Sequence, residues 1–305
     1  MGTPAFAVPS LGALVDGGHE VALVVTQPDR PKGRGRKLAK SAVKLRAEEL
    51  GLPVYQPEKV KAPDAVQRIA DVRPDLIVVA AFGQILPKSV LDIPAKGCIN
   101  VHASLLPKYR GAAPINWAII NGESVTGVTI MRMDVGMDTG DMLLKVEEPI
   151  GPDDTAGSLT GRMSVLGAGL LTKALGELEA GMITPVKQDA DMATYAPMLK
   201  KEMGRIDWTK SADELSRLVR GLDPWPGAYT ALGSDTLKVW SAAVYDEVSF
   251  SGVPGEIVDV NKNGIKVMTG SGVLVIKELQ AEGGRRMSVS DFLAGHAIVK
   301  EDRLV

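Results

Sequence analysis

The tightest constraint on the fold lies in residues 97–115, whose first half alternates like a β-strand and whose second half cannot continue one. Side chains repeat with a period of two along a strand, so Asn100 and His102 point to the same face. Pro107 and Pro114 interrupt regular structure soon afterwards and predict a rigid loop. Ligands of α/β folds bind at such carboxyl ends of strands, which makes this the first candidate site.

Strands that alternate with helices around this stretch predict an α/β fold with a doubly wound, mostly parallel, Rossmann-like sheet. The expected strands are 20–26, 72–81, the segment around 100–102, 127–133 and 142–147. The expected helices are 9–16, 41–50, 114–121 and 155–181. We therefore predict a first domain over residues 1–182.

The pattern changes beyond a linker predicted at residues 183–200. Five short alternating segments follow a predicted helix at 211–220: 229–232, 237–242, 255–260, 265–269 and 273–279. Such spacing is typical of a small OB-like β-barrel, which we predict for residues 201–305. Trp225, which stands between two prolines, is interpreted as a packed corner residue rather than a platform for base stacking.

Residues 1–8 look like the loop that follows the first strand of a parallel sheet, but no strand precedes them. Without that strand, its neighbours would leave backbone groups unpaired, at about 1–3 kcal/mol each. We therefore expect the natural protein to begin upstream of Met1.

Composition excludes several classes of protein. Cys98 is the only cysteine, which excludes an internal disulfide, and three histidines without a cysteine cluster leave little material for a zinc site. No segment has the roughly eighteen uncharged apolar residues that a membrane helix requires. We expect a cytoplasmic monomer that binds no membrane and no metal. The net charge is −2, so any affinity for nucleic acid must come from a local patch.

Such a patch lies between residues 30 and 46, where eight basic residues follow one another with no acidic residue among them. They are Arg30, Lys32, Arg34, Arg36, Lys37, Lys40, Lys44 and Arg46. Most charge runs are solvated surface loops. We favour a clamp on phosphates, because the run is unbalanced in sign within a slightly acidic chain.

A second cluster is the turn at residues 134–141, which contains Asp134, Asp138 and Asp141. Aspartate and glycine are the residues that tight turns select, so turn chemistry explains them without a function. A metal loop is a weaker interpretation, because the spacing does not match a calcium loop. A third possibility is that one of the acids partners His102.

The chemistry of the first candidate site follows from its residue types. An asparagine amide can donate to a developing oxyanion, and a histidine can hold or move a proton near neutral pH. Ser104 has no second histidine to activate it, and Cys98 stands four positions from His102, so we expect no covalent intermediate. The alternative is that His102 is a hydrogen-bonded core residue and Asn100 a strand-end residue.

The motifs at 100–111 (NVHASLLPKYRG) and 133–141 (MDVGMDTGD) resemble the formyltransferases that use 10-formyltetrahydrofolate. The resemblance covers nearly the whole chain. Within the family, the segments 27–31, 33–36, 205–208 and 224–227 are similar to those of the members that act on tRNA. This sequence departs from the family pattern at the missing first strand and at Asp223, where the family more often has asparagine.

The resemblance implies transfer of the formyl group of 10-formyltetrahydrofolate to the free amino group of methionyl initiator tRNA. It implies a catalytic trio of Asn100, His102 and Asp138. The residues expected at the folate are Phe82, Gly83, Ser104, Leu105, Leu106 and Pro107. Arg34 is the tRNA contact that the resemblance implies, and with the neighbouring cations the predicted tRNA-binding set is Arg30, Lys32, Arg34, Arg36 and Lys37.

Two alternatives remain open. A formyltransferase of the same family could act on a small amine, either an amino sugar nucleotide, which would not need the basic loop, or glycinamide ribonucleotide, whose enzymes usually lack the C-terminal barrel. A folate- or RNA-binding protein without catalysis would not need Asn100, His102 and Asp138 together.

Overall fold

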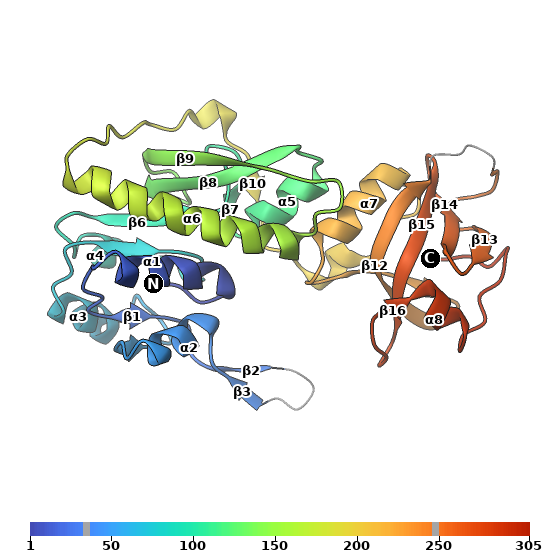
Figure 1. Cartoon of the computed structure of the whole chain (residues 1–305), viewed down its shortest axis with the longest axis horizontal. Helices are drawn as coiled ribbons and strands as arrows, with labels where there is room; N and C mark the ends of the chain where they lie inside the picture. The colour runs from blue at the N-terminus through green and yellow to red at the C-terminus, as the bar shows by residue number, and fades with distance from the viewer. Residues whose placement is uncertain (33–36, 246–249) are drawn as a thin grey trace. The chain divides into compact units, whose positions relative to one another are not determined.

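The strand predicted around Asn100 and His102 is β6 (Cys98–His102), which is buried along its whole length within a four-stranded sheet (Figure 1). It pairs in parallel with β5 (Ile77–Val79) and antiparallel with β8 (Val125–Arg132), which pairs antiparallel with β9 (Met142–Pro149). The computed structural model describes residues 1–32, 37–245 and 250–305. Two of the three strand pairings in this sheet are therefore antiparallel, although the α/β class is confirmed.

One long helix, α6 (Ala156–Glu179), packs against the part of this sheet that β6 and β8 form (Figure 1). Its Gly167 lies so close that an added Cβ would be 2.9 Å from Val101 Cγ1 and 3.4 Å from Val128 Cγ1. A larger residue would push the helix away from the strand that carries Asn100 and His102.

The other elements of the same part of the chain are short. The helices are η1 (Ala5–Ala7), α1 (Val8–Asp16), α2 (Ala42–Glu49), α3 (Pro63–Asp71), α4 (Lys88–Leu91) and η2 (Ala190–Met192), whereas α5 (Pro114–Ile120) belongs to the second compact unit from Ile115 on. The strands are β1 (Val24–Val25), β2 (Arg30–Lys32), β3 (Lys37–Ala39), β4 (Val54–Tyr55), β7 (Arg110–Gly111) and β10 (Tyr195–Ala196). Helix α2 begins as predicted, because the Ser41 side chain accepts from Lys44 N and caps it.

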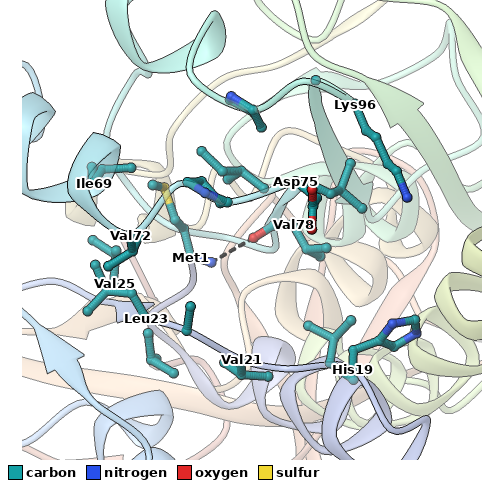
Figure 2. A pocket seen from close by; sticks show the side chains of 18 of the residues that line it. Met1, His19, Val21, Leu23, Val25, Ile69, Val72, Asp75, Val78 and Lys96 are labelled. Carbon is teal, nitrogen blue, oxygen red and sulfur yellow. Dashed lines mark hydrogen bonds between the residues drawn. The ribbon is translucent and has the colours of Figure 1, made fainter.

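A cavity of about 860 Å³ separates residues 19–25 from residues 72–80 (Figure 2). Its lining includes Val21, Leu23 and Val25 from the first segment and Val72 and Val78 from the second. The strand predicted at 20–26 is therefore reduced to Val24–Val25, because residues 20–23 face the cavity instead of a second strand.

The second part of the chain is built on an antiparallel sheet in the order β11-β12-β15-β14-β13, with β16 paired to β15. Its strands are β11 (Ala228–Leu232), β12 (Asp235–Tyr245), β13 (Ile257–Asn261), β14 (Gly264–Met268), β15 (Val273–Ala281) and β16 (Met287–Ser288). Its helices are η3 (Lys201–Gly204), α7 (Ala212–Gly221) and α8 (Val289–Leu293). Ser211 and Glu214 start α7 with a capping box, and apolar residues of α7 and α8 complete the core with the sheet.

The predicted barrel is not closed within the described residues, since β11 and β13 do not pair with each other. The segment 302–305 bonds to both instead: Ala231 and Val305 exchange two backbone hydrogen bonds, and Ile257 N donates to Asp302 O. Trp225 was predicted to be a packed corner residue, which is wrong, because 53% of its surface is exposed.

The chain divides into two compact units. The first contains residues 1–114, 125–149 and 160–196, and the second contains 115–124, 150–159 and 197–305. Residues 183–196 of the predicted linker thus lie in the first unit, where β10 pairs in parallel with β7. Among the described residues, no helix combines the length and the apolar character needed to cross a membrane.

The buried thiol of Cys98 provides a test of the packing around β6. Its side chain is 3% exposed, and burial raises the pKa of its thiol to about 11. At pH 8 the folded protein should therefore contain only about one thiolate per thousand and should resist a thiol-specific reagent such as DTNB. Denaturation with guanidinium should release one reactive thiol per chain. Rapid labelling of the native protein would contradict this packing of β6.

Candidate active site

Strand β6 carries two polar side chains, Asn100 and His102, that are buried in the fold. Asn100 is 9% exposed and His102 is 5% exposed. The two residues are two positions apart and share one face of the strand, as the alternation predicts. On the antiparallel side, Asn100 is opposite Met131 and His102 is opposite Thr129. The strand pairing thus sets their positions before any side-chain contact forms.

Of the three acids in the turn between β8 and β9, Asp138 is the one whose carboxylate meets these side chains. Asp138 Oδ2 lies 3.7 Å from His102 Nδ1 and accepts a hydrogen bond from Gly111 N at 2.9 Å. Asp138 Oδ1 is 3.5 Å from Asn100 Nδ2, a long contact. Asp134 serves the turn itself, because its Oδ1 accepts from Gly136 N and Thr139 Oγ1.

The imidazole of His102 has a defined orientation. Its Nε2 lies 3.0 Å from the carbonyl oxygen of Tyr109, and a carbonyl only accepts, so Nε2 carries the proton of this bond. In the neutral ring, Nδ1 is then the unprotonated nitrogen, and it faces Asp138. The 3.7 Å between Nδ1 and Oδ2 is too long for a direct hydrogen bond, but the two atoms face each other.

Thr129 anchors the loop that follows β6. Its hydroxyl donates to Ser104 O at 2.7 Å and accepts from Leu106 N at 3.1 Å, and Thr129 is fully buried. Ser104 Oγ donates to Lys108 O at 2.6 Å, which closes the loop on itself. The carbonyl of Tyr109 that orients His102 therefore belongs to a segment with little freedom.

The residues predicted at the folate lie in different environments. Leu105 and Pro107 are half-buried, and Gly83 is exposed, with φ +85°. Ser104, Leu106 and Phe82 are buried, and the Phe82 side chain belongs to an apolar core with Val25 and Val79. The carbonyl of Phe82 accepts from Thr3 Oγ1 and Gln27 Nε2.

The basic run is partly neutralised by acidic neighbours. Arg30 pairs with Glu58, Lys40 with Glu48, Lys44 with Asp29, and Arg46 with Glu49, at 2.7–3.0 Å. Strands β2 and β3 form a hairpin whose connecting residues 33–36 lie outside the described part of the chain. The predicted tRNA contacts Arg34 and Arg36 fall there, and the side chains of Lys32 and Lys37 are likewise not described.

Gln188 and Arg110 belong to the site although the sequence did not single them out as functional residues. Arg110 is buried, and both its Nε and its Nη2 donate to Gln188 Oε1. Gln188 Nε2 donates to the backbone carbonyls of Asp138 and Gly140. The sequence gave no signal that Gln188 is functional, because Gln188 lies in an extended segment without a pattern and its partners lie 48 to 78 positions away.

Within residues 1–32, 37–245 and 250–305, no group of three or more histidine, cysteine, aspartate or glutamate residues is arranged to hold a metal ion. The chemistry that the described site offers is an amide donor, an oriented imidazole and a carboxylate. Such a set can stabilise an oxyanion and transfer a proton without a covalent intermediate.

Comparison with known proteins gives this arrangement a class. Residues 1–175 match the formyl transferase family, and residues 198–297 match the formyl transferase C-terminal domain. The chain therefore belongs to the formyl transferase family.

Its relatives narrow the class. The methionyl-tRNA formyltransferase of Geobacter metallireducens is 57% identical over 97% of this chain and 94% of its own length. The methionyl-tRNA formyltransferase of Geobacter sulfurreducens is 55% identical over 100% of this chain and 95% of its own length.

Solved structures share the fold. An N-formyltransferase from Helicobacter canadensis, in complex with folinic acid and dTDP-3-aminofucose, has a TM-score of 0.66 at 19% identity, over 90% of this chain and 96% of that one. HypX from Aquifex aeolicus, in complex with tetrahydrofolic acid, has a TM-score of 0.60 at 22% identity, over 81% of this chain and 43% of that one.

Thr129→Val tests the anchor of the loop. The change keeps the shape of the side chain but leaves the Leu106 amide and the Ser104 carbonyl without this partner, so it should lower the free energy of unfolding by about 1–3 kcal/mol. Urea denaturation measures the loss. The matched control is Thr172→Val, at an exposed position of α6. Equal effects of the two substitutions would contradict the anchoring role.

Proposed function

We propose that this protein transfers the formyl group of 10-formyltetrahydrofolate to the amino group of methionyl initiator tRNA, with Asn100, His102 and Asp138 as its catalytic residues. The observation that carries the proposal is the convergence of these three side chains beside one rigid loop. The names of the relatives, at 55–57% identity over nearly the whole chain, support the choice of substrate. The proposal includes a cytoplasmic location and a monomer.

The reaction joins the amino nitrogen of the methionyl group to the formyl carbon and then breaks the bond from that carbon to N10 of the folate. Asn100 donates its amide hydrogens to the oxygen that becomes negative in the tetrahedral intermediate. His102 Nδ1 takes the proton that the attacking amine loses and returns it to N10 as the folate leaves. Asp138, whose Oδ2 lies 3.7 Å from Nδ1, stabilises the imidazolium in between.

The folate is proposed to bind between the loops that follow β5 and β6. These strands are parallel neighbours with Val79 opposite Asn100, so both loops leave the sheet at the same edge. Half-buried Leu105 and Pro107 and exposed Ile85 offer apolar surface to a flat ring beside main-chain polar groups. The folate compounds in the titles of the Helicobacter and Aquifex structures support this ligand class.

The tRNA is proposed to contact the β2–β3 hairpin. The predicted contacts are the cations from 30 to 37, whereas Lys44, farther along the run, holds a half-buried ion pair with Asp29 at 2.7 Å. Arg30 shares an exposed pair with Glu58, which is weak enough to be exchanged for a phosphate.

The test of this function is an assay of formyl transfer from 10-formyltetrahydrofolate to methionyl initiator tRNA, with uncharged tRNA as the control. Product should form only with the aminoacylated tRNA. A dTDP-linked amino sugar is the competing acceptor, since the Helicobacter structure contains one. Turnover of the sugar alone would overturn the tRNA proposal and leave the family assignment intact.

Asn100→Ala tests the oxyanion contact. Removal of one such donor typically costs about 10²–10³ in kcat, and we expect that loss with unchanged tRNA affinity. Steady-state kinetics and a binding titration measure the two quantities separately. Asn263→Ala, in an exposed turn of the second unit, is the control and should retain full activity. Weaker tRNA binding by Asn100→Ala would mean that Asn100 serves binding or structure.

Arg34→Ala tests the phosphate clamp. It should weaken tRNA binding and reduce the slope of log affinity against log salt by about one, because one fewer counterion is released. Binding titrations at four or five salt concentrations give the slope. Lys44→Ala removes a cation of the same run that already holds a half-buried ion pair with Asp29, and it should leave the slope unchanged. Identical slopes for all three proteins would argue against the clamp.

A further inference from the structure

Gln188 joins two loops of the site with all of its side-chain hydrogen-bonding groups. Its Nε2 donates to the carbonyl oxygens of Asp138 and Gly140, each at 2.8 Å. Its Oε1 accepts from Arg110 Nε at 3.0 Å and from Arg110 Nη2 at 2.8 Å. Two donated and two accepted bonds satisfy the amide completely, so its orientation is fixed.

These bonds are part of a hydrogen-bond network that holds Asp138 from two sides. Arg110 precedes Gly111, whose N donates to Asp138 Oδ2, and Gln188 holds the backbone of Asp138 from the other side. The acid is thus held at its carboxylate by one loop and at its carbonyl by another segment. The same segment is bound to the sheet, because Val186 and Met142 exchange backbone hydrogen bonds at 2.8 and 2.9 Å.

The side-chain hydrogen bonds within the turn are made by Asp134, whereas those of Asp138 go to residues outside the turn. The φ of Asp138, +53°, lies in the left-handed region, which a non-glycine residue adopts at a cost. Its neighbours Val135 and Met137 are exposed and add no core packing. The distance from Asp138 Oδ2 to His102 Nδ1 therefore depends on contacts from outside the turn.

We propose that Gln188 is a positioning residue that sets the distance between the Asp138 carboxylate and the His102 imidazole. The inference rests on the proposed roles of those two residues. Gln188 itself bonds to the backbone of Asp138 and to Arg110, so it acts on the reaction only through Asp138. The segment expected to be a linker thereby becomes part of the catalytic unit.

A double-mutant cycle separates positioning from general damage. Gln188→Met keeps the length of the side chain and removes every hydrogen bond, and it should lower kcat about 10- to 100-fold, with KM for tRNA changed less than about twofold. In an Asp138→Asn background, the same change should cost less than about twofold more, because the group that it positions is already lost. Gln67→Met, at an exposed position of α3, is the matched control and should be silent.

Two kinetic outcomes overturn the proposal. One is full activity of Gln188→Met in an enzyme that Asp138→Asn inactivates. The other is the same fold loss in both backgrounds, which means that Gln188 supports the fold and not the acid. Gln188→Glu keeps acceptors for Arg110 but has no donor for the two carbonyls, so it should be as impaired as Gln188→Met.

A measurement independent of activity separates this inference from the proposed function. The chain has three histidines, so ¹⁵N-labelled imidazole signals at a fixed pH can be assigned by substitution. Gln188→Met should move the His102 signals in the direction seen for Asp138→Asn, while His19 and His296 stay in place. An unmoved His102 would refute the positioning role. Absence of formyl transfer by the wild-type protein would refute the proposed function alone.

Discussion

The hydrogen bond from Gly111 N to the Asp138 carboxylate is the contact on which the rest of the site depends. It joins the loop after β6 to the turn between β8 and β9, and it places the negative charge opposite His102 Nδ1. The strand itself places Asn100 and His102 on one face, and the Tyr109 carbonyl orients the imidazole. The acid lies in a turn outside that strand, and bonds from Gly111 and Gln188 hold it.

Rigidity in the loop after β6 is built from few contacts. Thr129 reaches across from the neighbouring strand to bond to both Ser104 and Leu106, while Ser104 closes the loop on Lys108. The two bonds of Thr129 are buried, so each would leave an unsatisfied polar group if it were broken. The orientation of the imidazole follows, because its Nε2 proton points to the Tyr109 carbonyl of the same loop. A preorganised site of this kind spends little energy on reorganisation during the reaction.

The predictions agree with the structure where the signal comes from neighbours in the chain. They fail where residues that pack against an element determine its structure. The helices at 42–49 and 212–221 begin at the serines that the sequence indicated, since a cap lies within three residues of the amide that it satisfies. The strand predicted at 20–26 shrinks to two residues, because a strand needs neighbours that the sequence does not reveal. Trp225 was expected to be packed and is exposed, since its flanking prolines constrain the backbone but say nothing of what covers the ring.

The sequence by itself determined that an asparagine and a histidine share one face of a buried strand, that a rigid loop follows, and that basic residues gather near position 34. These are properties of neighbours in the chain, and periodicity or composition carries them. From the residues alone, the choice of Asp138 over Asp134 and Asp141 stayed open, and resemblance had to suggest it. Only the tertiary structure decided the surroundings of that acid. The contacts of Asp138 to Asn100, Gly111 and Gln188 span 27 to 50 positions, and such distances leave no trace in local pattern.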